Sequence, residues 1–402
     1  MLICRCQVLL IEARERLEFD LAVLFQGDQA LAARVEWVAL APHRDEERVI
    51  DAREWALLGS IGESLWVERE PFDARHGAEC VDALLDAGLL LAFEAPPERR
   101  LWRHWRERDQ RLRDSHWRPL NAAAHYASRW SSQNVKQDGR LAAFKDLREL
   151  VAAYGAMPPV ELEYPEAPQV ALPAPLRTTL DECLARRTTC RNFVLDPPLP
   201  LADFASMMHR CFAAQAEEER VPGARVLKKT SPSGGSLHPL SAFVLIRAVE
   251  GLAPGLYHYH AQQHRLAVID TDPATDWQAR ARLFVADQHW FADAAFSVIL
   301  VARFRRNFWK YRNHPKALRA ITLDAGHLSQ TLYLSATELG YGAFITAAIN
   351  EIDIEQALGL DPLVASPIAI LGCGRRGAHL QTVELDPAAQ VWNERQRRWP
   401  AA

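Results

Sequence analysis

The sequence predicts a two-part α+β protein, in which an α/β sandwich over residues 176–402 follows a smaller N-terminal domain. Three observations support this division. The chain of 402 residues is longer than one typical domain. Six prolines fall between Pro158 and Pro175, where they exclude a helix or an inner strand. Helix and strand patterns then alternate to the end of the chain, as expected for an α/β sandwich.

Composition narrows the function classes. The net charge is −4 and charged residues make up 24% of the chain, without the basic balance typical of nucleic-acid binders. The N-terminus lacks the pattern of a signal peptide, and no apolar run is long enough to span a membrane. We therefore expect a cytoplasmic protein. Seven scattered cysteines without a C-x-x-C pair predict neither a disulfide framework nor a metal site.

Residues 1–95 are predicted to form a small α+β domain. Val8–Glu12 and Val35–Ala39 are short apolar strand candidates. Asp51 can cap a helix over Ala52–Ile61, and Glu54 completes a capping box. These signals place one helix directly after the first strands.

The same domain continues with a second helix and a strand. Leu65–Val67 is a short strand or turn, and Asp73 precedes a helix with apolar residues at helical spacing. Gly88 ends that helix, and Leu89–Leu91 forms a strand. This order is typical of a winged-helix-like domain, which is a candidate peptide-recognition domain. The alternative is a small helical subdomain that only packs on the core.

Residues 96–155 are predicted to be a helical connector, and residues 156–175 a Pro-rich linker. The connector is rich in arginine and tryptophan. Acidic residues alternate with the arginines, which favours a solvated helix face with internal ion pairs over nucleic-acid contact.

Residues 176–402 carry the strongest secondary-structure signals. Helices are predicted over Leu176–Ala185, Leu201–Ala214 and Thr322–Leu339. Strands are predicted over Ala242–Ile246, Gly255–Tyr259, Leu266–Ile269, Ala294–Phe304 and Ser366–Gly372. The second and third of these strands are expected to form a hairpin.

A basic segment carries the first chemical signal. If the chain is extended there, Arg187, Thr189 and Arg191 project to one side. Two guanidinium groups and a hydroxyl then converge, which suits a phosphate monoester. A basic surface turn explains the same residues equally well.

A second signal is the loop Ser231–Pro239, with the sequence Ser-Pro-Ser-Gly-Gly-Ser-Leu-His-Pro. Its glycines let the backbone approach a ligand closely, and its N–H and hydroxyl groups can meet a flat polar ring. A plain turn is the alternative interpretation.

Taken together, these motifs resemble the SagB-type dehydrogenases of the flavin nitroreductase superfamily. The resemblance rests on the basic segment, the glycine loop, Gly255–Tyr259, Trp309–Tyr311, Leu323–Gln330 and Leu371–Gly374, in that order. It covers residues 176–378, and the first 175 residues match only loosely. It implies a nitroreductase-like α/β/α sandwich that forms a homodimer and binds FMN at the subunit interface.

The resemblance also implies roles for individual residues. Arg187, Thr189 and Arg191 would hold the phosphate and ribityl chain, and Ser233, Gly234 and Ser236 would face the isoalloxazine. Thr189 replaces the usual Ser, and Ser236 stands where many nitroreductases have Asn. Arg375 and Arg376, which follow the last strand, would contact the phosphate. Gln330 of the central helix would reach the cofactor or line the dimer interface.

Lys310 and Tyr311 correspond to the pair that supports dehydrogenation in azoline-oxidising members. Converting a thiazoline or oxazoline into an azole removes a Cα proton and a Cβ hydride. FMN accepts the hydride, and a base such as Lys310 must take the proton. Neighbouring residues of a strand point in opposite directions, so both can act only from a loop or a helix. The alternative is a surface lysine beside a half-buried tyrosine.

Three functions are therefore compared. The leading one is FMN-dependent oxidation of azoline rings in a ribosomally made precursor peptide, with oxygen as final oxidant and a cyclase as candidate partner. The second is NAD(P)H-dependent reduction of a dehydroamino acid, nitro or quinone substrate. The third is a non-catalytic scaffold that binds precursor peptide for a partner enzyme. No nucleic-acid or membrane partner is expected.

Overall fold

The structure is a computed structural model that describes residues 1–19, 25, 31–44, 46–137, 147–161 and 164–392. The chain divides into two compact units. Unit 1 comprises Met1–Arg129, Arg303–Ala320 and Asp361–Ala365, and unit 2 comprises Trp130–Ala302, Ile321–Leu360 and Ser366–Ala402. The domain boundaries at residues 95, 155 and 175 remain predictions.

Unit 1 contains a small three-stranded sheet with the order β5-β1-β6. Its strands are β1 (Leu2–Arg5), β5 (Val67–Glu68) and β6 (Leu90–Ala92). Three helices precede or separate these strands: α2 (Ala52–Ser60), α3 (Glu70–His76) and α4 (Ala78–Asp86). The predicted capping box between Asp51 and Glu54 begins α2. The apolar residues Cys80, Val81, Leu84 and Leu85 of α4 are buried, as their spacing predicts.

One helix of unit 1 differs from the prediction. The sequence places Asp73 before a single helix, whereas the structure has two helices joined at Gly77. Asp73 lies within α3, where its carboxylate accepts a hydrogen bond from Arg69 at 2.8 Å. Gly77 has a φ of 84°, a conformation that interrupts a helix and that glycine adopts without strain. Gly88, with a φ of 68°, follows α4 as predicted.

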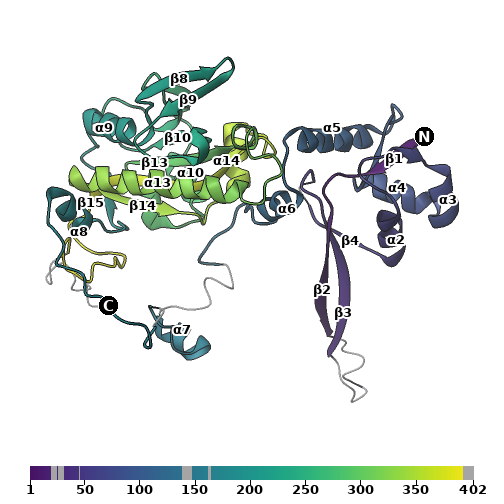
Figure 1. Cartoon of the computed structure of the whole chain (residues 1–402), viewed down its shortest axis with the longest axis horizontal. Coiled ribbons are helices and arrows are strands. Elements are labelled where there is room, and N and C mark those ends of the chain that lie inside the picture. The colour runs from purple at the N-terminus through teal and green to yellow at the C-terminus, as the bar shows by residue number, and fades with distance from the viewer. Residues whose placement is uncertain (20–24, 26–30, 45, 138–146, 162–163, 393–402) are drawn as a thin grey trace. The chain divides into compact units, whose positions relative to one another are not determined.

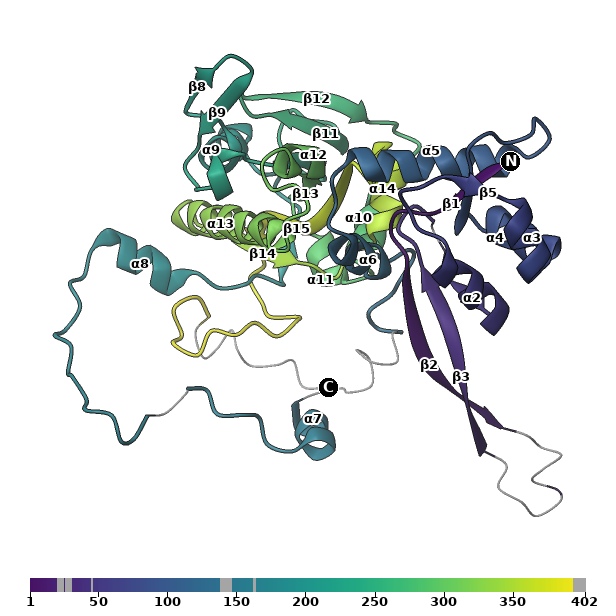
Figure 2. The same cartoon turned by 45° about the vertical axis from the view of Figure 1, so that its right-hand side comes forward.

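A long antiparallel hairpin also belongs to unit 1. It pairs β2 (Leu10–Phe19) with β3 (Leu31–Leu40), and β4 (Arg48–Ile50) adds to the base of β3. Figure 2 shows the hairpin extending beyond the helices of its own unit. The sequence predicts strands at both positions but starts the first one two residues early, at Val8. It also makes both about half as long, because the outer halves of the strands mix charged and apolar residues.

The predicted helical connector contains α5 (Arg100–Asp114), α6 (Pro119–Ala127) and α7 (Leu147–Tyr154). The predicted ion pairing occurs within α5, where Arg113 donates to the buried carboxylate of Asp109 at 2.6 Å. Within the described part of the Pro-rich stretch, residues 155–161 and 164–177 form neither helix nor strand.

Unit 2 is built on a seven-stranded sheet with the order β12-β11-β10-β13-β15-β14, in which β7 also pairs with β15. Neighbouring strands run antiparallel at β12-β11, β11-β10, β10-β13, β15-β14 and β15-β7. The strands are β7 (Phe193–Val194), β10 (Leu240–Ile246), β11 (Gly255–His260), β12 (Arg265–Asp270), β13 (Phe296–Arg303), β14 (Gly342–Thr346) and β15 (Ala365–Arg376). The predicted hairpin of β11 and β12 is confirmed.

Helices pack on this sheet, and α13 (Ala317–Glu338) runs beside β13, β15 and β14 in both views (Figures 1 and 2). Unit 2 also contains α8 (Thr179–Arg186), α9 (Leu201–Phe212), α10 (Trp277–Phe284), α11 (His289–Ala292) and α14 (Glu351–Leu358), whereas α12 (Phe304–Phe308) belongs to unit 1. A separate hairpin joins β8 (Ala216–Val221) to β9 (Ala224–Lys228). The predicted helices over residues 201–214 and 322–339 are confirmed, the latter with an extra turn at its start.

Candidate functional site

The basic segment runs extended beside β14. Thr189 forms a parallel bridge with Ala343, and the Cys190 N–H donates to the Ala343 carbonyl at 2.8 Å. Along this segment burial alternates: Thr188, Cys190 and Asn192 are buried, whereas Arg187, Thr189 and Arg191 are partly exposed. The two arginines and the hydroxyl therefore share the accessible side, as an extended chain requires.

Arg187 and Thr189 meet at one tyrosine of the central helix. The Thr189 hydroxyl lies 3.0 Å from the hydroxyl of Tyr333, and the Arg187 guanidinium lies 5.4 Å from the centre of the same ring. Tyr333 is buried in α13. Its ring supports the arginine by a cation–π contact, so a single residue positions two of the three predicted ligands of this segment.

Arg191 faces a neighbouring pocket of about 550 Å³. Its guanidinium lies 5.9 Å from the centre of the Phe291 ring. The pocket is also lined by His289 and Trp290 of α11 and by residues 377–379 and 381–382. Burial lowers the pKa of His289, whose Nδ1 lies 2.9 Å from the Lys136 ammonium. The pocket thus combines the cationic Arg191 with aromatic side chains and with the carboxylate of Asp293.

Arg376 is engaged inside the protein. Its guanidinium donates to the buried carboxylate of Glu384 at 2.8 Å and to the Thr188 hydroxyl at 2.9 Å. The same carboxylate accepts the N–H groups of Arg191 at 2.5 Å and of Asn192 at 3.0 Å. Arg376 and Glu384 therefore hold the backbone of the basic segment.

Arg375, the other member of the predicted basic pair, turns toward the loop before α9. Its Nε donates to the Pro197 carbonyl at 3.1 Å, and its guanidinium lies 5.6 Å from the centre of the Tyr341 ring. Arg375 and Arg376 therefore have different neighbours, because successive residues of β15 point to opposite faces of the sheet.

The glycine loop is attached to α13 by a carboxylate. The Ser233 hydroxyl donates to Asp324 Oδ2 at 2.5 Å, and the Gly234 N–H donates to Oδ1 at 3.1 Å. The Ser231 hydroxyl lies 2.7 Å from that of Thr331 on the same helix. The buried Asp324 belongs to the predicted Leu323–Gln330 motif, although its role is not visible in the sequence.

Backbone geometry explains one of the two glycines of this loop, Gly235. Gly235 has a φ of 63° and the following Ser236 a φ of 55°, both in the left-handed region. The short 3₁₀ turn Gly234–Ser236 leaves Gly235 and Ser236 exposed. Any other residue at position 235 would add strain, because the turn already holds Ser236 in the left-handed region.

The two predicted cofactor segments contact opposite faces of α13. Asp324, which holds the loop, and Tyr333, which meets the basic segment, are nine residues apart in this helix. At 3.6 residues per turn, nine residues rotate by about 900°, which is half a turn beyond two full turns. Within one chain, the loop and the basic segment therefore approach the helix from different sides.

Gln330 lies on the exposed stripe of the same helix. Leu323 is 58% exposed, and Gly326 has open space where a side chain would be. Leu323, Gly326 and Gln330 follow one another at helical spacing, so they share a face. This face carries an exposed leucine, an exposed glycine and a carboxamide.

Lys310 and Tyr311 belong to unit 1, whereas the other predicted site residues belong to unit 2. They lie in a turn after α12, where the Lys310 ammonium is 5.6 Å from the centre of the Tyr311 ring. Lys310 is exposed and Tyr311 half-buried. Because this segment is a turn, the two side chains are not required to point in opposite directions, as neighbouring residues of a strand are.

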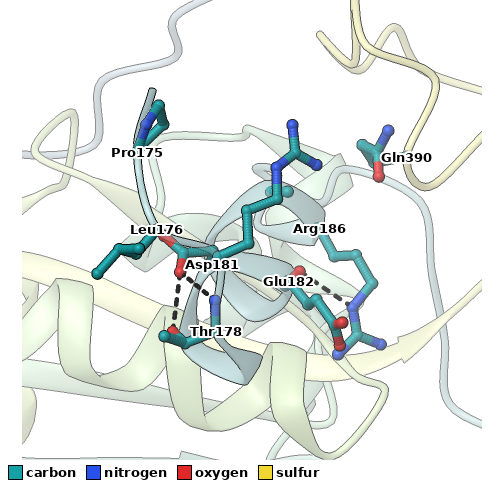
Figure 3. A pocket seen from close by; sticks show the side chains of 9 residues that line it. Pro175, Leu176, Thr178, Asp181, Glu182, Arg186 and Gln390 are labelled. Carbon is teal, nitrogen blue, oxygen red and sulfur yellow. Dashed lines mark hydrogen bonds between the residues drawn. The ribbon is translucent and has the colours of Figure 1, made fainter. Parts of the chain in front are cut away.

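A second pocket, of about 780 Å³, lies on the surface of α8 (Figure 3). Figure 3 shows the Asp181 carboxylate turned back to Thr178, whose N–H and hydroxyl donate to it at 2.7 and 2.8 Å. These contacts cap the helix, and none of the predicted site residues lines this pocket. The capping box also places the start of α8 three residues later than predicted.

The described residues contain no cluster of three or more His, Cys, Asp or Glu side chains arranged to hold a metal ion. None of their helices combines the length and apolar character needed to cross a membrane.

Comparisons with known proteins agree with this fold. Residues 184–375 match the family model described as the nitroreductase family. The trifolitoxin-processing protein TfxB of Rhizobium leguminosarum biovar trifolii is 29% identical over 154 residues, which cover 38% of this chain and 41% of TfxB. The chain thus matches about two fifths of the length of that relative.

Two further proteins are similar. A protein of Methanocaldococcus jannaschii that is named as a nitroreductase is 26% identical over 202 residues, which cover 50% of this chain and 95% of that protein. A chain of the Escherichia coli microcin synthetase McbBCD complex with truncated pro-MccB17 bound shares the fold, with a TM-score of 0.50 and 18% identity over 67% of this chain and 94% of that one.

The matched region contains the sheet from β7 to β14, the central helix and most of β15. It also contains the basic segment and the glycine loop, which the sequence singled out before. The chain therefore carries a nitroreductase family domain, with a nitroreductase-like mixed α/β fold, over residues 184–375.

Proposed function

We propose that this protein is an FMN-dependent dehydrogenase that oxidises azoline rings of a precursor peptide to azoles. The observation that carries the proposal is the common accessible side of Arg187, Thr189 and Arg191 beside the central helix of a nitroreductase family domain. The family assignment supports an oxidoreductase, and the peptide-processing relative supports a peptide substrate.

The residues of the basic segment fit the phosphate end of FMN. A phosphate monoester carries close to two negative charges at neutral pH, and guanidinium groups bind such anions through paired N–H donors. Arg187, Thr189 and Arg191 offer these donors, whereas Arg376 is already paired with Glu384. We therefore assign the phosphate to the first three residues, and Arg376 to supporting them.

The glycine loop fits the ring end. Ser233 and Gly234 are fixed by Asp324, which leaves Gly235 and Ser236 exposed in a left-handed turn. In one chain this loop and the basic segment contact opposite faces of α13. The two proposed ends of the cofactor site therefore do not face each other within a single copy. This arrangement supports a homodimer in which each site combines segments from both copies. The exposed face of Leu323, Gly326 and Gln330 is the proposed dimer contact.

The chemistry assigns the proton to Lys310. Bound FMN would accept the Cβ hydride of the azoline, and oxygen would be the final electron acceptor. The Cα proton leaves at the same stage and needs a base within hydrogen-bonding reach. Lys310 is exposed and lies in a turn, so its amine is available to take this proton, and the adjacent Tyr311 ring restricts the amine's position.

The N-terminal part is proposed to recognise the peptide. Its order of helix α2, strand β5, helices α3 and α4, and strand β6 is winged-helix-like, and β1 lies between β5 and β6. The E. coli structure that shares the fold is a complex with a bound precursor. A cyclase that forms the azoline rings is the corresponding proposed partner, since the dehydrogenase needs rings as its substrate.

Reduction by NAD(P)H is the second candidate, because the M. jannaschii relative is named as a nitroreductase. The direction of electron flow separates the two functions. Azoline oxidation removes two hydrogens per ring from the peptide and needs no nicotinamide. Reduction consumes NAD(P)H in the steady state with a nitro, quinone or dehydroamino acid substrate.

The decisive experiment combines absorbance and mass spectrometry. The purified protein should show the visible absorbance of oxidised flavin and should remove two hydrogens per ring from an azoline-containing peptide. Lys310→Ala should keep the absorbance and lose the oxidation. A protein without flavin would support the scaffold function instead, and full activity of Lys310→Ala would refute the assignment of the base.

A further inference from the structure

The turn that carries Lys310 and Tyr311, residues 309–316, is closed by a residue of the preceding helix α12. Asn307, at 1% exposure, is buried in the last turn of α12. Its carbonyl accepts the N–H groups of Lys310 at 3.3 Å and of Tyr311 at 3.1 Å. Its side-chain amide donates to the carbonyl of Ala317, where α13 begins, at 3.0 Å. One asparagine thus binds both ends of the turn.

A second asparagine holds the same turn from α6. The Asn121 amide donates to the Pro315 carbonyl at 3.3 Å, and the nearby His116 carbonyl accepts the Asn313 N–H at 3.0 Å. Residues 313, 315 and 317 therefore each form a backbone hydrogen bond with a residue outside the turn. Two of the three bonds come from residues upstream of the nitroreductase match.

Aromatic packing fixes the base of this arrangement. Trp117, which is 1% exposed, lies 4.4 Å from Phe304 and 4.8 Å from Phe308 between ring centres. Its indole N–H donates to the Leu363 carbonyl at 3.1 Å. All these residues belong to unit 1. The aromatic contacts thus hold helix α12 in place. The hydrogen bonds of the two asparagines hold the turn that follows it.

We propose that Asn121 and Asn307 are positioning residues, which fix the turn so that Lys310 is presented to its substrate. This inference rests on the proposed function for its catalytic meaning. The N-terminal part of the chain would then contribute to the oxidation step, in addition to any binding of peptide. A base is effective only within hydrogen-bonding reach of its proton, and displacements of about 1 Å are costly.

Asn121 offers the cleaner test, because it is half-buried and its replacement leaves the apolar core intact. Asn121→Ala removes the amide, and Asn121→Asp keeps the shape but cannot donate to the Pro315 carbonyl. Both should lower kcat about fivefold to tenfold, as expected for one lost hydrogen bond that orients a base. KM for the peptide, FMN content and Tm should not change. Leu120→Ala, which alters a 60% exposed neighbour on α6, is the matched control.

Hydrogen exchange gives a readout that does not need activity. Deuterium uptake in residues 309–316 should rise in both Asn121 variants and stay at the wild-type level in Leu120→Ala. If uptake and kcat of Asn121→Asp equal those of the control, the positioning role is refuted. If the wild type oxidises no azoline but the variants still gain uptake, the positioning of the turn stands and the proposed function fails.

Discussion

Asp324 holds Ser233 across 91 positions of sequence: the serine hydroxyl donates to its Oδ2 at 2.5 Å, while the Gly234 N–H donates to its other oxygen at 3.1 Å. A buried carboxylate of the central helix thus fixes the loop that is proposed to face the flavin ring. This bond joins two motifs that the sequence shows separately.

Asp324→Ala should therefore weaken FMN binding without unfolding the domain. The variant leaves the Ser233 hydroxyl and the Gly234 N–H without their acceptor, at a cost of about 1–3 kcal/mol for charge-assisted hydrogen bonds. We expect about a tenfold or greater rise in the Kd for FMN, measured by flavin fluorescence. Thr331→Val removes one of the two hydrogen-bond partners of the Ser231 hydroxyl and leaves the His327 carbonyl, so it should have a smaller effect. Equal affinity in Asp324→Ala and the wild type would show that the loop does not touch the cofactor.

Arg187 and Arg376 should respond differently to replacement. Arg187 contacts the buried Tyr333 ring from the accessible side, so Arg187→Ala should weaken FMN binding and leave the urea midpoint unchanged. Arg376→Ala leaves the fully buried Glu384 carboxylate without its cation, which should lower the free energy of unfolding by about 3 kcal/mol.

Urea denaturation and FMN titration of both variants make this comparison. Arg376→Ala can also weaken binding, since Glu384 holds the N–H groups of Arg191 and Asn192. The distinction therefore rests on stability. A stable Arg376→Ala variant, together with a destabilised Arg187→Ala variant, would reverse the two roles.

The exposed face of α13 allows a test of the dimer. Gly326 is exposed and nothing lies within 4 Å of the position of its missing side chain, so Gly326→Arg fits within one chain. Arginine is also a better helix former than glycine, by roughly 0.8 kcal/mol. If α13 forms the dimer contact, the variant should be monomeric and should lose FMN.

Sedimentation velocity measures the outcome, and Gly59→Arg is the matched control. Gly59 lies in α2, is exposed and has equally open surroundings. It should keep the oligomeric state of the wild type. A Gly326→Arg protein that stays dimeric would exclude this face from the contact.

The sequence predicts most elements of unit 2 because their apolar spacing is regular. Phe204, Met207, Met208 and Cys211 recur at helical spacing and are all buried in α9. By contrast, β14 (Gly342–Thr346) is short and begins with glycine, so local preference does not indicate a strand. It forms because β15 pairs with it from Gly342 to Thr346. Such pairing is a property of the folded chain.

The candidate site divides in the same way. Alternation along an extended chain is a local property, so the common side of Arg187, Thr189 and Arg191 follows from the sequence. The supports of these residues come from distant positions and belong to no motif: Tyr333 meets Thr189 at 3.0 Å, and Glu384 meets Arg376 at 2.8 Å. A sequence shows two basic residues at the end of β15, but only the fold shows that one of them is paired.

The buried His43 predicts how the stability of unit 1 depends on pH. Its Nε2 lies 2.8 Å from the Gly88 carbonyl, and the residue is 0% exposed. Burial lowers the pKa of His43 to about 4, against the opposing influence of Asp109. The unfolded chain, with a histidine pKa near 6.5, binds this proton more readily. Stability is therefore fully present above about pH 6.5 and is lost as the pH falls toward about 4, by up to about 3 kcal/mol.

His43→Gln isolates this contribution, because glutamine can still donate to the Gly88 carbonyl but does not titrate. Urea denaturation is measured at roughly pH 7, 5.5 and 4.5, which covers most of the interval between the two pKa values. The free energy of unfolding should fall more steeply with decreasing pH for the wild type than for the variant. At pH 7 the variant should be the less stable of the two, since the imidazole fits its site. Other groups titrate in both proteins and cancel in the comparison. Parallel losses of stability would mean that His43 takes up its proton in the folded state as easily as in the unfolded chain.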